Sequence, residues 1–562
     1  MLESGAITHP PGAIRGTRMA ELLTPGIQVA EEPGPEHSIA RASTAITAFV
    51  GRALRGPCNQ PVTLASFADF QRLFGGLWQP SMLGYAVEQF FENGGREAII
   101  VRVANGASPK TLTLPAGEGT LTLEATCPGT REYLRASVDY DNIGENEEDR
   151  FNLVVQRIRT PGSEFVEDQE IYRRLSVDPA VGRSYVPIGL ADSALVRFVG
   201  EVPAARPDRT LHAHGGLVGY VQSNPNGDDG APPTDYDIIG SATEGTGLHA
   251  LKGVESFNFL CIPPLTRDVD VGPSALMVAA RLVRERSALL IVDPPAAWTS
   301  AEAALEAMHD WYFASQNAVM YFPRIVAYDR LRGRHETFAP SGAVAGMLAR
   351  HDETWPVWSP AEGEDAILRA GYRPLCAVAD AERARLAYAG INTLQSVRSS
   401  VRLGLSPRTL CGPSAESPDW KYLSARRLAL FILNSIERGT RWVLFDQNGP
   451  DLWRRVTARV EEFLAGLEAA GAFIGHAQDE AYFVACDERL NDGSAAHAGS
   501  VRLLFGFAAA RSGDYHSYLI THSAAGSRVE RVSYNRLLSA SYRVDEEIES
   551  TPAMRAAIAP YL

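Results

Sequence analysis

Residues 24–104 read TPGIQVAEEPGPEHSIARASTAITAFVGRALRGPCNQPVTLASFADFQRLFGGLWQPSMLGYAVEQFFENGGREAIIVRVA. Apolar and polar residues alternate over Ile27–Glu32, a period of two that predicts a strand, and a second strand is predicted over Thr44–Val50. Two helices are predicted next, one that begins after Ser66 and one over Leu83–Asn93. Ala98–Val103 is a short, continuously apolar run, which is typical of a strand buried on both faces.

The same alternation of strand and helix returns after residue 248. Apolar strands are predicted over Phe257–Ile262 and Ala288–Val292, and a third over Ala318–Tyr328 that Pro323 interrupts. Helices are predicted between them, over Pro273–Glu285 and Ser300–Phe313. This rhythm predicts a three-layer α/β core with a mostly parallel sheet.

Residues 105–235 have a different character and predict a β-rich unit. The elements expected there are a hairpin over Thr111–Ala125, strands over Leu134–Tyr140 and Phe151–Ile158, a short helix over Glu170–Leu175, and a polar linker at Gln222–Gly230. The run that begins DYDNIG at Asp139 invites comparison with a calcium loop, but Ile143 and Arg150 stand where that loop needs an oxygen ligand and a glutamate. We therefore predict no metal site.

The C-terminal part begins with another run of predicted helices and strands. Helices are predicted over Trp420–Glu437 and Leu452–Ala470, and strands over Trp442–Phe445, Ala481–Cys486, Val501–Phe507, Tyr515–Thr521 and Arg528–Val532. Leu452, Val456, Val460, Phe463, Leu464 and Leu467 share one face of the second helix, and Arg454, Arg455 and Arg459 lie on its polar side.

Composition excludes several functions. The chain of 562 residues has a formal net charge of −14, which disfavours nonspecific binding to nucleic acid. No signal peptide and no apolar run long enough to span a membrane is found, so we expect a protein made in the cytoplasm. The six cysteines, Cys58, Cys127, Cys261, Cys376, Cys411 and Cys486, are scattered and predict free thiols, with cross-links between neighbouring subunits left open.

Two blocks of sequence resemble contractile tail sheath proteins, the family that forms the contracting sleeve of phage tails and related bacterial injection systems. The first block reads AFVGRA-x-RGP, SFADF-x-RLFGG and LGYAV-x-QFFENGGR-x-A-x-x-VRV, between Ala48 and Val103. The second reads RRLALFI-x-x-SI-x-RGT-x-WVLF-x-x-N and AYFV-x-CDE, between Arg426 and Glu488. Both blocks are dense and ordered, so the resemblance is specific.

The resemblance implies a subtilisin-like sheath core with an inserted domain and strand-bearing arms. The implied parts are 1–35 as an N-terminal arm with a donated strand, 36–104 and 236–410 as the core, 105–235 as an inserted β-rich outer domain, 411–522 as the C-terminal domain with its hairpin, and 523–562 as a tail of no assigned role. Strand donation to neighbouring subunits is implied for Ile27, Gln28, Val29, Ala30, Glu31, Tyr515, His516, Ser517, Tyr518, Leu519 and Ile520.

The implied function is that of a structural subunit without cofactor. Copies of the chain would form hexameric rings in a helical sheath around a tail tube, with baseplate and tail terminator proteins as further partners and no nucleic acid or membrane insertion. The assembly would belong to a virion tail or injection particle built in the bacterial cytoplasm. Arg454, Arg455 and Arg459 are candidates for facing an acidic tube, and a solvated basic face is the equal alternative.

Two other functions stay open from the residues alone. One is a static filament or shell protein that uses the same strand exchange. The other is a subtilisin-like hydrolase, for which His249, His309, His351, Asp293 and Ser341 are present. No G-x-S-x-G elbow or fixed triad spacing accompanies these residues, so we expect no enzyme.

Overall fold

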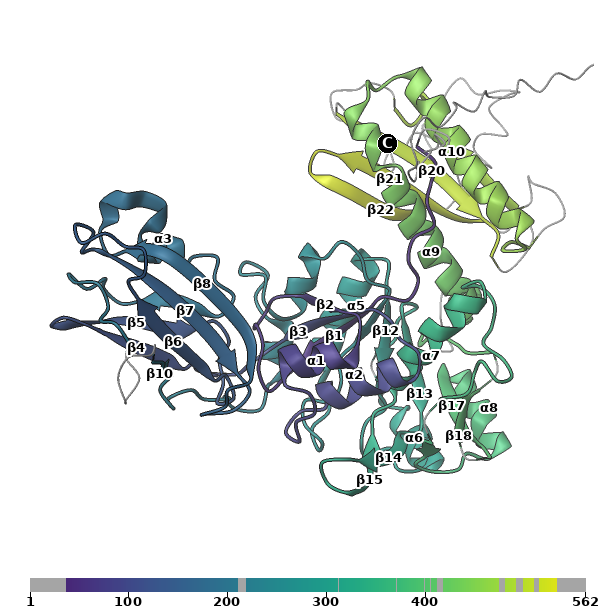
Figure 1. Ribbon diagram of the computed structural model, residues 1–562. Coiled ribbons are helices and arrows are strands. Elements are labelled where there is room, and N and C mark those ends of the chain that lie inside the picture. The colour runs from purple at the N-terminus through teal and green to yellow at the C-terminus, as the bar shows by residue number, and fades with distance from the viewer. Residues whose placement is uncertain are drawn as a thin grey trace, which may run out of the picture.

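The computed structural model describes residues 37–210, 219–311, 313–369, 371–398, 400–404, 406–411, 418–474, 481–491, 499–509 and 515–532. Figure 1 shows three parts: a central α/β core, a β-rich lobe on one side of it, and a C-terminal lobe at the far end of helix α9. The donated strand predicted at Ile27–Glu31 lies outside the described residues, as does the whole tail after Val532.

The core contains one eight-stranded sheet in the order β18-β17-β13-β12-β11-β1-β3-β2. Its strands are β1 (Thr47–Gly51), β2 (Val62–Leu64), β3 (Ala98–Arg102), β11 (Phe259–Cys261), β12 (Leu289–Val292), β13 (Ala318–Phe322), β17 (Ile391–Val397) and β18 (Ser400–Leu403). The strands from β17 to β3 pair in parallel, and β18 and β2 add an antiparallel strand at each edge. The prediction of a mostly parallel α/β sheet is confirmed.

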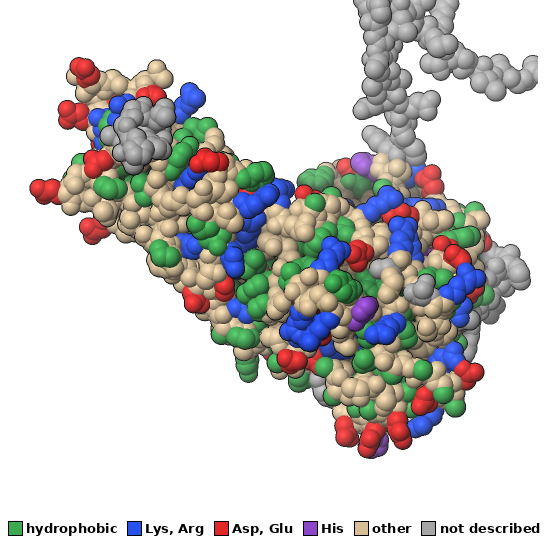
Figure 2. Space-filling view, turned by 60° about the horizontal axis from the view of Figure 1, so that its bottom comes forward, with side chains coloured by type: hydrophobic (Ala, Val, Ile, Leu, Met, Phe, Trp, Pro, Cys, Tyr) green, Lys and Arg blue, Asp and Glu red, His purple; other side chains and the backbone are tan. Residues whose placement is uncertain are grey.

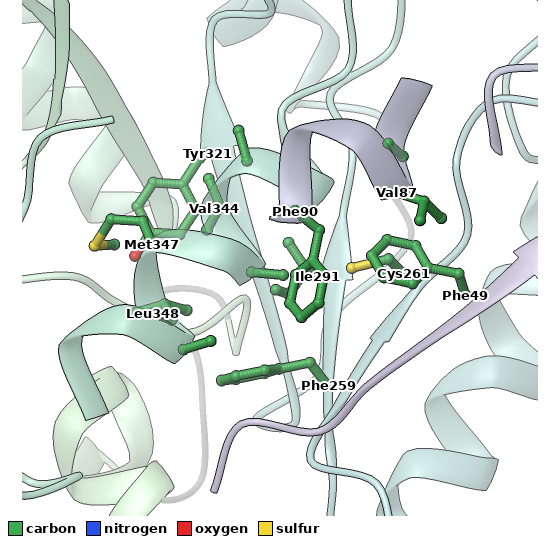
Figure 3. Packing of buried hydrophobic residues seen from close by; sticks show 14 of the residues in the cluster. Phe49, Val87, Phe90, Phe259, Cys261, Ile291, Tyr321, Val344, Met347 and Leu348 are labelled. Atoms are coloured by element: carbon green, nitrogen blue, oxygen red, sulfur yellow. The ribbon is translucent and has the colours of Figure 1, made fainter. Parts of the chain in front are cut away.

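Helices cover both faces of this sheet, because successive side chains of a strand point to opposite faces. Phe49 of β1 packs with α1 (Phe67–Phe74), α2 (Leu83–Glu92) and α7 (Ser341–Thr354) in one hydrophobic cluster. Its neighbours Ala48 and Val50 belong to a second cluster, with α5 (Pro273–Glu285), α6 (Ala301–Ala307) and α8 (Asp380–Tyr388). Figure 3 shows the first cluster, where Phe90 of α2 lies among side chains of the sheet and of α7.

The first helix of the core begins where its sequence predicts and ends at a glycine. The backbone N–H of Asp69 donates to the Ser66 hydroxyl at 3.2 Å, which satisfies one of the free N–H groups at the start of α1. Gly75 ends the helix at φ 87°, in the left-handed region that glycine adopts without strain.

A small sheet and several short helices complete the core. Strand β14 (Ile325–Asp329) pairs with β15 (Arg334–Phe338) and β16 (Arg373–Pro374). The predicted strand Ala318–Tyr328 is thus divided at Pro323 into β13 and β14. The short helices are α4 (Asp235–Ile239), η2 (Gly247–Gly253) and η3 (Pro418–Lys421).

The β-rich lobe, residues 111–222, consists of two antiparallel sheets around their own hydrophobic cluster. One sheet has the order β4-β5-β9 and the other β10-β6-β7-β8, with short helices η1 (Pro179–Ser184) and α3 (Val186–Gly189) between β8 and β9. The strands are β4 (Thr111–Ala116), β5 (Gly119–Ala125), β6 (Leu134–Asp139), β7 (Arg150–Ile158), β8 (Val166–Ser176), β9 (Val196–Val199) and β10 (Val221–Gln222). The helix predicted at Glu170–Leu175 is wrong, because this segment pairs with β7 as part of β8.

Arginines join the lobe to the core. Arg55 forms a 2.9 Å ion pair with Glu167 of β8, and the Arg52 guanidinium donates to the carbonyl oxygens of Asp229 and Gly230 in the segment that leads from the lobe back to the core. Figure 2 shows the lobe extending from the core, whose visible face carries basic and acidic side chains intermixed with apolar ones.

The C-terminal lobe is organised by two long helices. These are α9 (Leu423–Gly439) and α10 (Pro450–Ala469), and the short η4 (Arg441–Phe445) lies between them. The strand predicted at Trp442–Phe445 is wrong: the run is a 3₁₀ helix in which Val443 is buried and Phe445 is 90% exposed. Within the described residues, no helix is long and apolar enough to cross a lipid bilayer.

Candidate assembly interface

The C-terminal lobe contains a four-stranded antiparallel sheet in the order β19-β20-β21-β22. Its strands are β19 (Tyr482–Ala485), β20 (Ser500–Phe507), β21 (His516–Ser523) and β22 (Gly526–Val532). One face of this sheet packs with α9 and α10 in a hydrophobic cluster that includes Phe505, Tyr518 and Ile520. The lobe is therefore a helix-covered sheet with two edge strands, β19 and β22.

Of the predicted donated residues near the C-terminus, His516–Ile520 lie in β21 at the centre of this sheet, and Tyr515 immediately precedes that strand. Strand β21 pairs with β20 on one side and with β22 on the other, both within the same chain. These residues thus occupy an inner strand, and any strand added to the described sheet would extend it at β19 or β22. The sequence identified the sheet but did not identify its edges.

Helix α10 presents the three predicted tube-facing arginines on its exposed side, but each has an acidic partner in the same chain. Arg454 pairs with Asp451 and Arg455 with Asp446, and Arg459 contacts Glu462 at 2.8 Å. The predicted apolar face of α10 is buried, at Leu452, Val456, Val460, Leu464 and Leu467. The arginines therefore form a surface of local ion pairs, and an acidic partner would have to exchange with Asp451, Asp446 and Glu462.

A buried arginine, whose role no sequence pattern predicted, joins this lobe to the core. Arg426 of α9 donates to the Asn317 side-chain oxygen at 2.7 and 3.1 Å, and its third nitrogen lies 3.4 Å from the Tyr518 hydroxyl. Burial lowers the pKa of this guanidinium. Since Asn317 precedes β13 and Tyr518 lies in β21, Arg426 fixes α9 between the two sheets.

The residues of the hydrolase hypothesis do not form a triad. Ser341 is fully buried, and both its hydroxyl and its backbone N–H donate to Asp293, at 2.7 and 2.8 Å, so Asp293 stabilises the start of α7. Burial raises the pKa of Asp293 to about 6, and the hydrogen bonds from Ser341 oppose this shift. His351 contacts the Ser359 carbonyl at 3.1 Å, and within the described part of the chain no histidine hydrogen-bonds to Ser341 or Asp293.

A buried histidine couples the β21–β22 hairpin to the end of α9. Thr440 donates its hydroxyl proton to the Ile436 carbonyl, so the Thr440 oxygen accepts from Nε2 of His522 at 2.8 Å. Nδ1 of His522 then accepts from the Ser527 hydroxyl at 2.7 Å. Burial lowers the pKa of His522 to about 4, so the imidazole is neutral in the folded protein near pH 7.

We expect acid to destabilise the hairpin through His522. Its folded pKa lies below the unfolded value of 6.5, so the unfolded state binds more protons and stability falls as pH drops from about 6.5 towards 4. The expected loss between pH 7 and about pH 4.5 is about 2 kcal/mol. Denaturant unfolding of the wild type and His522→Gln at both pH values measures it; the variant should lose less stability than the wild type, and equal losses would contradict the assignment.

Comparisons with known proteins agree with this architecture. A family model described as the phage tail sheath C-terminal domain matches residues 415–516, which span α9, α10, β19 and β20. No curated protein sequence matches the chain.

Among solved structures, the sheath tail protein Lin1278 from Listeria innocua matches with a TM-score of 0.58 at 13% identity, over 86% of this chain and 96% of that chain. The sheath tail protein DSY3957 from Desulfitobacterium hafniense matches with a TM-score of 0.50 at 14% identity, over 90% of this chain and 99% of that chain. At these identities the matches show a shared fold over nearly the whole length of both relatives.

Proposed function

The chain carries a phage tail sheath C-terminal domain and has the fold of sheath proteins, and from this premise we propose that it is a subunit of a contractile sheath. The observation that carries the proposal is the family match over residues 415–516, which contain most of the candidate assembly interface. Copies of the chain would polymerise around a tail tube and contract to drive that tube through a target envelope.

Strand exchange is the proposed link between subunits. Both described ends of the chain lie against the C-terminal lobe: the His37 ring stacks on Trp442 at 4.1 Å, and Val532 pairs with Ser517 of β21. Residues 1–36 and the tail after Val532 are therefore joined to the described chain at the lobe whose sheet has two edge strands. An alternating segment such as Ile27–Glu31 would add to a neighbour's sheet through backbone hydrogen bonds, with Tyr515–Ile520 as an inner strand of the extended sheet.

The proposed assembly is a helix of rings. Head-to-tail contacts that do not close on themselves generate an open helix, and hexameric rings stacked in this way form a sheath. The extended sheath would be metastable, so that its lifetime is set by a barrier, and contraction would be a rigid rearrangement that uses no nucleotide. The further partners would be the tail tube, the baseplate and a tail terminator.

Contacts with the tube through Arg454, Arg455 and Arg459 form part of the proposal. Each exposed ion pair contributes only about 0–1 kcal/mol, so exchanging an intramolecular carboxylate for one on the tube changes the free energy little. Weak, repeated contacts of this kind would hold the extended state and still release during contraction.

Negative-stain electron microscopy of the purified protein tests the proposal. The full chain is expected to form wide hollow tubes, and a version without residues 1–35 is expected to remain as separate particles, because it lacks the strand that joins neighbours. Gln28→Pro and Val29→Pro, tested separately, sharpen the test. Adjacent residues of a strand direct their N–H groups to opposite sides, so one of these prolines must remove a hydrogen bond to the neighbouring strand.

Gln28→Thr and Val29→Ile keep the backbone N–H and are the matched controls, which should assemble like the wild type. Separate particles from the full chain, even after a cognate tube and baseplate are added, would reject the sheath assignment. Tubes from all variants, truncation included, would reject strand exchange through Ile27–Glu31 and leave the sheath assignment standing.

A further inference from the structure

Residues 37–46 form an extended segment, here called the strap, that crosses from the C-terminal lobe to the core. It runs antiparallel to the end of α9: the His37 ring stacks on Trp442, Ile39 lies against Gly439, and the Ala42 N–H donates to the Ser435 hydroxyl at 3.0 Å. Figure 1 shows this purple segment passing alongside α9. Three successive contacts of the strap are therefore made with α9 and η4 of the C-terminal lobe.

The contact between Ile39 and Gly439 depends on the absence of a side chain at Gly439. A Cβ atom on Gly439 would lie 2.8 Å from Cγ2 of Ile39, closer than real Cβ contacts come, and 3.1 Å from its Cβ, which is tighter than most real contacts. Ile39 packs with the hydrophobic cluster of the C-terminal lobe. Gly439 thus forms a notch in α9 that receives Ile39, and the space is available only because the residue is glycine.

The aromatic contact at the outer end of the strap is held from two elements. Trp442 of η4 stacks with His37 at an interplanar angle of 9°, and the Arg455 guanidinium lies 5.3 Å from the centre of the Trp442 rings. A stacked pair of this kind adds about 0.5–1.5 kcal/mol beyond the area that it buries. The strap is therefore fastened where residues 1–36 join it.

The hydrogen bonds between the strap and the core lie further along the chain. The Asn258 side chain donates to the Ser43 carbonyl at 2.7 Å and accepts from the Ile46 N–H at 3.0 Å, immediately before β1 begins at Thr47. A force that pulls on residue 36 therefore acts on the contacts with Trp442, Gly439 and Ser435 before it acts on the core sheet.

We propose that the strap is a fixed anchor that transmits load from residues 1–36 into the C-terminal lobe and keeps it from β1. The proposal rests on the proposed function, since such a load arises only when a neighbouring subunit holds that segment. Because the strap is fixed, any rotation between linked subunits takes place in the chain that precedes His37. Residues 37–46 keep their contacts in both the extended and the contracted sheath.

Gly439→Val tests whether the notch holds the strap. Hydrogen exchange of the full chain is expected to accelerate at the Ala42 amide by about five- to ten-fold, the effect of losing one modest hydrogen bond, while the Ile46 amide keeps its protection through Asn258. Gly466→Val is the matched control, because a Cβ at this exposed glycine of α10 meets nothing within 4 Å. Unchanged exchange at Ala42 in Gly439→Val, or the same acceleration in Gly466→Val, would overturn the proposal.

A disulfide between the strap and α9 tests whether the strap stays in place during assembly. In Ile39→Cys/Gly439→Cys the two Cβ atoms would lie 3.1 Å apart, slightly less than the roughly 3.5–4.5 Å found in a disulfide, so a small outward shift of the strap allows the bond to form and one protein can be compared oxidised and reduced. Equal formation and contraction of tubes in both states is expected, with Ile39→Cys alone as the control. If oxidation blocks assembly or contraction, the strap must detach and the anchor is wrong.

Different results would reject the proposed sheath function and the proposed attachment of the strap. If the unmodified chain forms no tubes under any condition, the proposed function is wrong and so is the role of the strap in carrying load. The exchange experiment on the single subunit still decides whether the Gly439 notch fastens residues 37–42 to the C-terminal lobe.

Discussion

Replacing Gly346 by alanine is expected to lower the free energy of unfolding of the core by about 3 kcal/mol, the upper part of the range for overpacked sites. Gly346 lies in α7 where this helix packs directly on α2. A Cβ there would lie 2.2 Å from the Phe90 carbonyl oxygen and 3.1 Å from Cβ of Asn93. Because the nearest atom belongs to the α2 backbone, the helices must move apart to make room.

Moving α2 and α7 apart would disturb the hydrophobic cluster that these helices form with one face of the core sheet. Phe90 of α2 and Val344, Met347 and Leu348 of α7 belong to this cluster, together with the sheet side chains that Figure 3 shows around them. Interiors of this density tolerate a change of even one methyl group poorly. Gly342, one turn earlier in α7, has the same relation to the Ala86 carbonyl, at 2.1 Å, so the contact extends along the helix pair.

Hydrogen exchange of the β12 amides is the suitable measurement, because it reports opening of the core separately from the two lobes. Gly466→Ala in α10 is the control: its Cβ has open space, and alanine should stabilise that helix by about 1 kcal/mol through its better helix propensity. If Gly346→Ala also stabilises the protein, α2 and α7 are not in the close contact described.

Replacing Asp352 by alanine is expected to cost about 3–5 kcal/mol, since it leaves a buried charge without its partner. Arg427 of α9 and Asp352 of α7 form an ion pair whose side chains are only 6% and 4% exposed. The Arg427 guanidinium also lies 5.2 Å from the centre of the Phe259 ring. The pair therefore connects α9, and with it the C-terminal lobe, to the helix layer of the core.

A double-mutant cycle with Arg427→Met and Asp352→Leu separates the charge from the packing. The double variant should recover most of the stability lost in the single variants, because removing both charges leaves no uncompensated ion. Denaturant unfolding followed by fluorescence is the measurement. A loss below about 1 kcal/mol in Asp352→Ala would mean that water screens the pair as it does at a surface.

The core was predictable from sequence because its signals are local. Ala98–Val103 and Ala288–Val292 are apolar runs between turn residues, and their hydrophobicity alone marks them as strands buried on both faces. The predicted cap at Ser66 is confirmed for the same reason, since the hydroxyl and the N–H that it binds are three residues apart.

Local signals failed where distant pairing decides the structure. Glu170–Leu175 has the composition of a helix, but β7 supplies a strand partner and the segment joins β8. Trp442–Phe445 is apolar enough for a strand, but it pairs with no strand among the described residues, and its side chains divide between Val443 inside and Phe445 outside.

The sequence by itself determined the alternation of strands and helices, the mostly parallel core and, through two dense motifs, the resemblance to sheath proteins. Only the tertiary structure decided which strands form the edges of the C-terminal sheet, how α10 pairs its arginines, and where the N-terminal strap is fastened. The reason is physical: the Ala42–Ser435 hydrogen bond joins residues 393 positions apart. A contact of that kind exists only after the core has brought both segments together, so neither segment carries a local pattern that predicts it.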